Sequence, residues 1–179
     1  MPRVPYLSRE DATPDTEAVW QRVEAERKMP TANIFRALAH APALLDAFLS
    51  YANALLDESE LDPRLRELAI LAVGHATGAE YEIAHHRSHA IKAGLTQQQI
   101  ADAADFENSD GFDDAELAVM RLARESTLQV HVSDQRWAGA RAHLSARQMV
   151  ELCMTIAWYN SGVRIMGSLG IELEDSYRH

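Results

Sequence analysis

Cysteine is almost absent from this sequence, which contains Cys153 as its single thiol among 179 residues. One cysteine cannot form a disulfide within the chain, and such usage is typical of proteins of the reducing cytoplasm. The sequence also lacks any apolar run of the roughly 18–20 residues that a membrane-spanning helix needs, and its first ten residues lack the apolar core of a signal peptide. We therefore expect a cytoplasmic protein that has no membrane partner.

Positive charge is also scarce, because 17 lysines and arginines face 27 aspartates and glutamates, a formal net charge of -10. An acidic surface repels phosphate backbones, so this balance argues against nucleic acid as a partner. Hydrophobic residues make up 47% of the chain and charged residues 25%, which is an ordinary globular mixture. The length suits one domain with a sizeable core.

Runs of β-branched residues with period-two alternation are missing, and proline and glycine lie mostly at junctions between apolar periodic segments. These features predict a single domain of the all-α class. Strong helix starts are Asp62 before Pro63 and two capping boxes, Thr96 with Gln99 and Ser145 with Gln148. The expected helices cover about 15–28, 43–57, a segment from 63 whose end is weakened by Gly74 and Gly78, 80–93, a short segment after 96, 114–128, 134–143 and 146–165.

Three segments are expected to lie outside these helices. Residues 29–33 are a predicted linker, and the acidic stretch from Asp102 to Asp114 has the composition of a solvated loop that could serve as a lid. The polar segment from Glu172 to His179 is a predicted loose tail.

The densest group of ionisable side chains lies on the expected helix over 80–93. Glu82, His86 and His89 follow one another at i, i+4 and i+7 and therefore share one stripe, with His85 beside it and Tyr81 flanking it. Imidazoles and carboxylates can exchange protons near neutral pH. The stripe is a candidate acid–base site.

A further acid, Glu67, is placed in the apolar helix that precedes this stripe. It reaches the stripe if the two helices fold back on each other, as the short glycine-containing connection suggests. Burial then raises a carboxyl pKa while a nearby imidazole lowers it, and such opposed effects give one pocket both an acid and a base. From spacing alone, the alternative of solvated residues with a weak Glu82–His86 surface pair stays open.

A metal site built from Glu82, His86 and His89 is a weaker alternative, because the spacing differs from the His-Glu-x-x-His pattern. Late in the last apolar helix, Arg164 is a candidate anchor for a substrate carboxylate, and Tyr159 and Asn160 could add hydrogen-bond donors. The alternative is that Arg164 pairs with a structural acid.

At these residues the sequence resembles the carboxymuconolactone decarboxylase family, which belongs with alkylhydroperoxidase D in one superfamily. The resemblance covers about Phe35 to Ile171 and is densest in Arg66-Glu67-Leu68 followed by Glu80-Tyr81-Glu82-Ile83-Ala84-His85-His86. The family pattern is an Arg-Glu-Leu helix start and then Cys-x-x-Cys-x-x-x-His or Cys-x-Tyr-Glu-x-x-x-His. Glu67, Tyr81, Glu82 and His86 occupy the matching places.

The peroxidase branch of the family carries a cysteine pair at the places of Ala79 and Glu82. One thiolate attacks the peroxide and the other resolves the intermediate. Neither place holds sulfur here, and Cys153 lies in an apolar helix where we expect an inert core residue. Dithiol peroxidase activity is therefore not expected.

The resemblance implies an alkylhydroperoxidase D-like helical bundle, with residues 1–34 as a helical extension, 35–171 as the family domain and 172–179 as the tail. It also implies a homo-oligomer, a trimer or hexamer, that uses no metal and no cofactor. The expected activity is that of a carboxy-lyase of the decarboxylase type on a small, carboxylated, cyclic molecule. Glu67, Tyr81, Glu82 and His86 would be catalytic, and the other site residues named above would bind the substrate: His85, His89, Tyr159, Asn160 and Arg164.

Two other functions remain open from the sequence. A peroxidase-type antioxidant protein would have to act through Cys153, and a peroxide assay with Cys153→Ser would detect it. A non-catalytic binding protein would keep the fold and pair Glu67 and His86 internally.

Overall fold

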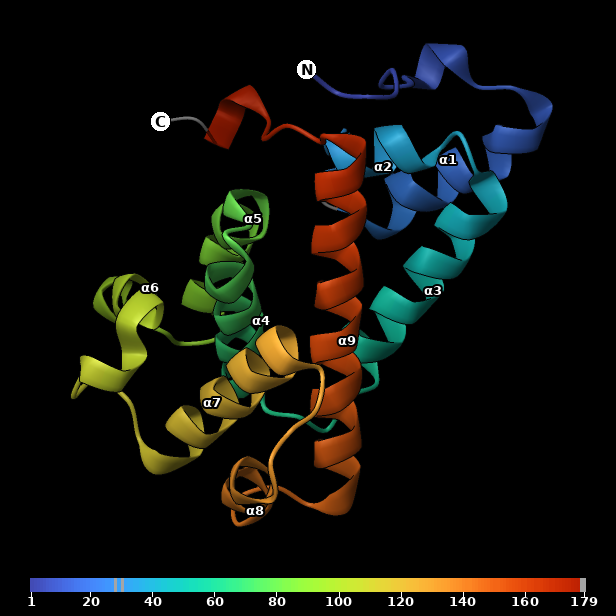
Figure 1. Cartoon of the computed structure of the whole chain (residues 1–179). Helices are drawn as coiled ribbons and strands as arrows, with labels where there is room; N and C mark the ends of the chain where they lie inside the picture. Colours follow the sequence, from blue (N-terminus) through green and yellow to red (C-terminus); the bar gives the residue numbers. More distant parts are fainter. Residues whose placement is uncertain (28, 30, 178–179) are drawn as a thin grey trace. The chain divides into compact units, whose positions relative to one another are not determined.

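The computed structural model describes residues 1–27, 29 and 31–177, and these residues form helices, turns and loops without a β-strand. The predicted all-α class is confirmed. The chain divides into two compact units, one made of residues 1–58 together with the segment from 164 onward, and one made of residues 59–163. Figure 1 shows the course of the chain, and each unit is described by itself.

The first unit is built on three helices, α1 (Pro14–Glu26), α2 (Asn33–Leu38) and α3 (Pro42–Asp57). Prolines at the starts of α1 and α3 occupy a position where the missing N–H costs nothing. The buried core of this unit lies mainly between α1 and α3. Its buried side chains are Val19, Trp20, Val23, Ala39, Leu45 and Leu49.

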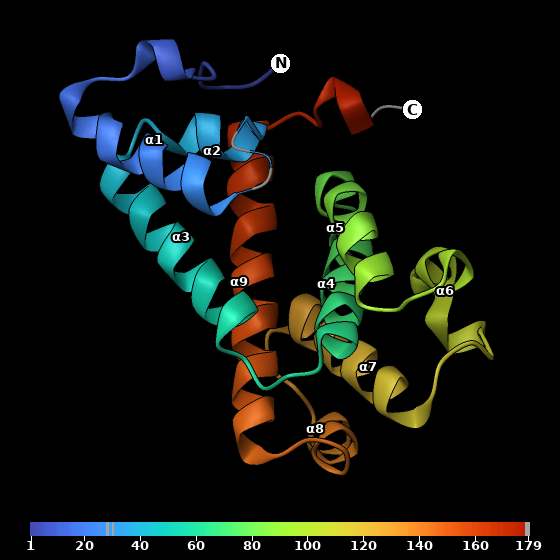
Figure 2. The same cartoon turned by 180° about the vertical axis from the view of Figure 1, so that it is seen from behind.

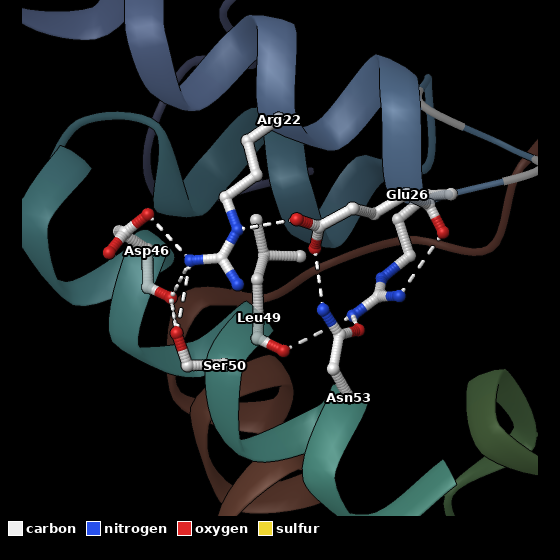
Figure 3. Close-up of polar contacts among 7 residues, drawn as sticks. Arg22, Glu26, Asp46, Leu49, Ser50 and Asn53 are labelled. Carbon is white, nitrogen blue, oxygen red and sulfur yellow. Dashed lines mark hydrogen bonds and ion pairs between the residues drawn. The ribbon is translucent and has the colours of Figure 1, made fainter. Parts of the chain in front are cut away.

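Polar side chains bridge α1 and α3 above that core (Figure 3). Arg22 donates to the carboxylate of Glu26 at 2.7 Å and to that of Asp46 at 2.6 Å. Asn53 in turn donates to the other oxygen of Glu26 at 2.7 Å. The bond from Arg22 to Asp46 and the bond from Asn53 to Glu26 both cross between α1 and α3. They therefore help to set how the two helices align along their length.

The segment after residue 171 differs from its prediction. The backbone N–H of Glu172 donates to the Tyr6 hydroxyl at 2.8 Å, and the backbone N–H of Asn33 donates to Glu174 at 2.6 Å. A short 3-10 helix, η3, follows at Asp175–Tyr177. Because these bonds hold residues 172–177, the prediction of a loose tail was wrong for them. Residues 178 and 179 lie outside the described residues, as does residue 28, the predicted end of the first helix.

The second unit is organised around α4 (Pro63–Thr77), which packs against α5 (Glu80–Lys92) and α7 (Asp114–Gln129) (Figures 1 and 2). Every side chain from Leu68 to Val73 is buried, so the predicted core helix is confirmed. The remaining elements are α6 (Gln97–Asp102), the 3-10 helix η2 (Ala103–Asn108), α8 (Asp134–Arg141) and α9 (Ala146–Leu169), which belongs to this unit as far as Val163.

The predicted helix starts are found where local chemistry placed them. The carboxylate of Asp62 accepts from the N–H of Arg64 at 2.8 Å and caps α4. Both capping boxes form, at Thr96 with Gln99 and at Ser145 with Gln148. At the end of α4, Gly78 adopts a left-handed conformation with φ 66°, which ends the helix and turns the chain toward α5.

Three segments differ from their sequence predictions. Helix α2 was not predicted, because its six residues are too short to show a period. The acidic stretch forms η2 as far as Asn108 and buries Phe106, so the prediction of a loop was wrong for that part, whereas residues 109–113 form a loop in which most side chains are not buried. Helix α9 continues to Leu169, past the predicted end. No helix within the described residues is both long and apolar enough to cross a membrane.

Candidate active site

The turn at Gly78 folds α5 back along α4 and brings Glu67 and His86 into contact. Nδ1 of His86 lies 2.8 Å from Oε2 of Glu67. Because an ionised carboxylate can only accept, Nδ1 carries the hydrogen of this bond. The two side chains are 12% and 4% exposed, so the contact is almost dry. The predicted approach of Glu67 to the α5 stripe is confirmed.

The opposite edge of the His86 ring, which carries Nε2, is directed at Glu82, one helical turn earlier in α5. Nε2 of His86 lies 3.5 Å from Oε2 of Glu82, and the Glu82 side chain is 11% exposed. The imidazole therefore stands between two carboxylates, which hold its orientation from opposite sides. The alternative of a solvated surface pair is wrong, since all three groups are largely buried.

Burial and charge act together on the protons of this group. Burial raises the pKa of Glu82 above the ordinary carboxyl value, although the neighbouring His86 and His85 oppose that effect. Burial alone would lower the pKa of His86, but the charge and the hydrogen bond of Glu67 outweigh it and raise that pKa. Glu82 and His86 thus form a coupled pair that retains protons to higher pH than either group does in water.

Aromatic rings border the imidazole. The ring of Tyr159, from α9, meets the His86 ring edge-on at 4.9 Å between centroids. Tyr81 stacks on His85 at 4.3 Å with an angle of 11° between the planes. His89, an exposed residue, lies 5.4 Å from His86 in a tilted arrangement. The structure thus gathers five of the predicted residues around Glu67 and Glu82, and their roles toward a substrate stay predictions.

The remaining two predicted residues stand in other surroundings. Asn160 donates through its amide nitrogen to the Thr127 hydroxyl at 2.9 Å and to the carbonyl of Ile156 at 3.0 Å. The bond to Thr127 joins α9 to α7, whereas the bond to Ile156 lies within α9. Arg164 is exposed and belongs to the first unit, so its role as a carboxylate anchor stays a prediction.

Gly74 is a residue of the site that the sequence analysis did not single out. A Cβ at this position would lie 2.9 Å from Cγ1 of Ile83 and 3.8 Å from Cβ of Glu82. Such a contact is too short, so glycine is what allows α4 and α5 to approach this closely. The sequence signal is a glycine inside a helix interior, where alanine would be more stable by about 1 kcal/mol.

A pocket elsewhere in the second unit lacks comparable chemistry. It has a volume of about 230 Å³ and lies at the α7–α8 connection. Arg121 and Arg124 on its wall both pair with Glu107, and Arg136 pairs with Glu125, so all three guanidinium groups are engaged in ion pairs. The lining residues are Arg121, Arg124, Glu125, Leu128, Gln129, Ser133, Gln135 and Arg136.

Cys153 offers no activated sulfur. It is a half-buried residue of α9, and burial raises the pKa of its thiol. The thiolate is the nucleophilic form, so this environment disfavours nucleophilic attack. Among the described residues, no group of three or more histidine, cysteine, aspartate and glutamate side chains is arranged to hold a metal ion.

Comparison with known proteins gives the same assignment as the motif. A sequence model of the carboxymuconolactone decarboxylase family matches residues 42–125, which include Glu67, Glu82 and His86. The uncharacterized protein YdfG of Bacillus subtilis (strain 168) is 30% identical over 115 residues, which cover 63% of this chain and 78% of YdfG. This chain belongs to the carboxymuconolactone decarboxylase family.

Solved structures share the fold of this family member at lower identity. The debrominase Bmp8, as a variant in complex with 2,3,4-tribromopyrrole, is 21% identical with a TM-score of 0.83 and covers 98% of this chain and 93% of its own. An alkylhydroperoxidase AhpD core protein from Ralstonia eutropha JMP134, described as an uncharacterized peroxidase-related protein, is 19% identical with a TM-score of 0.83, at 98% and 94% coverage. The predicted alkylhydroperoxidase D-like fold is confirmed, in a member that lacks the redox cysteine pair.

Proposed function

We propose that this protein is a cofactor-independent acid–base enzyme, a carboxy-lyase of the decarboxylase type that acts on a small, carboxylated, cyclic substrate. The observation that carries the proposal is the buried array in which His86 stands 2.8 Å from Glu67 and 3.5 Å from Glu82. A protonated acid held beside an imidazole in a water-poor site is suited to deliver a proton to carbon.

The reaction balances with one proton from the protein. The bond between the ring carbon and the substrate carboxylate breaks, carbon dioxide leaves, and the electron pair spreads into the unsaturated ring. The proton of Glu82 then passes to a carbon of that ring, which shifts a double bond and leaves the Glu82 carboxylate. Water returns the proton, so one proton is consumed for each carbon dioxide released. The raised pKa of Glu82 keeps the acid form available for this step.

His86 and Glu67 serve that acid. The imidazolium of His86 stabilises the Glu82 carboxylate that forms after proton transfer. It can also relay to that carboxylate the proton that water supplies, so the ring ends the cycle protonated. Glu67 holds the ring through Nδ1 and stabilises its charged form. This arrangement recovers the acid for the next cycle without a metal.

The test offers purified protein a panel of carboxylated lactones and unsaturated dicarboxylic acids, with released carbon dioxide and ultraviolet absorbance as readouts. Glu82→Gln and His86→Ala should each lower turnover at least ~100-fold, the usual contribution of a general acid or base. Glu80→Gln is the matched control, because Glu80 is an exposed acid of the same helix. Turnover that persists in both site variants would overturn the assignment.

Two further assays separate the competing functions. Bromopyrroles belong in the panel because a debrominase shares the fold, and bromide release in place of carbon dioxide would contradict the carboxy-lyase proposal. Hydroperoxide reduction that disappears in Cys153→Ser would instead favour an antioxidant protein. Tight binding of a panel compound without turnover would favour a binding protein.

A further inference from the structure

The two carboxylate oxygens of Glu82 have different surroundings. Oε2 faces the imidazole of His86 at 3.5 Å. Oε1 is directed toward α9, where a Cβ placed on Gly162 would lie 3.4 Å from it. Glu82 is also the more accessible acid of the site, with 11% of its side chain exposed against 4% for Glu67.

The glycine at position 162 has no backbone explanation. Its φ is outside the left-handed region, unlike the φ of Gly78, Gly94 and Gly170. It is a buried residue within α9, where glycine costs about 1 kcal/mol relative to alanine. What distinguishes position 162 is therefore its neighbour, the Oε1 oxygen of Glu82.

Apart from the backbone of α9 itself, Oε1 of Glu82 is the only atom of the described residues that a Cβ on Gly162 would meet within 4 Å. A donor binds a carboxylate oxygen at about 2.5–3.2 Å. An alanine methyl at 3.4 Å from Oε1 would cover the same side of the oxygen without being able to donate. Glycine has no Cβ and therefore leaves that side of Oε1 uncovered.

We infer that Gly162 is a specificity-determining residue that keeps Oε1 of Glu82 open to the substrate, so that the ring edge receiving the proton stands against the α9 backbone at this position. The inference rests on the proposed function. Glu82 then uses its two oxygens for different tasks, with Oε1 exchanging the proton with substrate and Oε2 facing His86. In this arrangement a branched substituent on that ring edge would meet the α9 backbone, so a flat, unbranched edge is favoured.

The test compares Gly162→Ala with Gly167→Ala, an exposed glycine of the same helix whose Cβ would meet no atom within 4 Å. Both changes favour a helix equally, so they differ in what the methyl covers. The first readout is labelling of Glu82 by a water-soluble carbodiimide and an amine, located by peptide mass spectrometry, with exposed Glu80 as the internal reference. Labelling of Glu82 should fall about tenfold or more in Gly162→Ala and stay unchanged in Gly167→Ala.

The second readout is turnover of the compound found with the panel. Gly162→Ala should lower kcat/KM about 10- to 100-fold with the melting temperature kept, and Gly167→Ala should keep wild-type kinetics. A lower melting temperature with unchanged KM and unchanged labelling would mean that Gly162 only makes room for packing, and would overturn the inference.

The wild-type protein provides a further test that depends neither on the folding of Gly162→Ala nor on a known substrate. In the folded wild type, Glu82 must react with the carbodiimide faster than Glu67. The reverse order would overturn the inference that Oε1 of Glu82 is open to a substrate. A panel without any substrate contradicts the proposed function, whereas the labelling ratio between Gly162→Ala and wild type still decides the role of Gly162.

Discussion

Substitution of Gly74 by alanine should reveal how closely α4 and α5 must approach to build the site. The new Cβ would lie 2.9 Å from Cγ1 of Ile83, whereas carbon atoms pack best at about 3.5–4.0 Å. The helices must therefore separate or Ile83 must change its rotamer, and overpacking of this kind costs about 1–3 kcal/mol. Alanine offsets up to about 1 kcal/mol of this cost through its better helix propensity. We expect a net destabilisation of about 0–2 kcal/mol.

The sign of the effect should reverse when the opposing side chain is removed. Ile83→Ala deletes the Cγ1 atom, so Gly74→Ala in that background keeps its propensity gain without the overlap. There it should stabilise the protein by up to about 1 kcal/mol. The coupling energy between the two positions is then about 1–3 kcal/mol.

Urea unfolding of the wild type, both single variants and the double variant measures this coupling. Equal effects of Gly74→Ala in the two backgrounds would refute the reasoning, because they would mean that Ile83 does not limit the approach of the helices. An NMR titration of the imidazoles adds a functional readout. Separation of the helices in Gly74→Ala should weaken the contact of Glu67 with His86 and lower the pKa of His86 relative to wild type.

The other predictions concern pH and capping. Burial raises the pKa of Glu82, and Glu67 raises the pKa of His86 despite burial. The native state therefore holds protons that the unfolded state releases. The free energy of unfolding should consequently fall as the pH rises through the titration of Glu82 and His86. In Glu82→Gln this loss should be smaller at pH values above 4.5, the ordinary value for a glutamate carboxyl. If urea unfolding of the variant showed the same dependence of stability on pH as the wild type, the raised pKa of Glu82 would be contradicted. Asp62→Ala removes the cap at the N–H of Arg64 and should cost about 0.5–2 kcal/mol, whereas Asp62→Asn should restore most of the stability, measured by thermal unfolding.

Much of the second unit could be predicted from the sequence because its signals are local. A cap involves residues two or three positions apart, as in Asp62 with Arg64 or Thr96 with Gln99, and such contacts hardly depend on the remainder of the chain. The stripe of Glu82 and His86 follows in the same way from the helical repeat. Segments with weak periodicity, such as α2 and the acidic stretch, were decided by packing and were therefore missed or misjudged.

The tertiary structure alone decided the chemistry of the stripe. No local signal indicates that Glu67 contacts the ring of His86, which lies 19 positions further along the chain. The spacing also does not reveal that Glu82 is buried deeply enough for its pKa to rise. Both follow from the close approach of α4 and α5 that Gly74 permits. The sequence by itself therefore determined which groups could exchange protons. Burial between packed helices determined their proton affinities, because desolvation and charge pairing depend on neighbours that only the fold supplies.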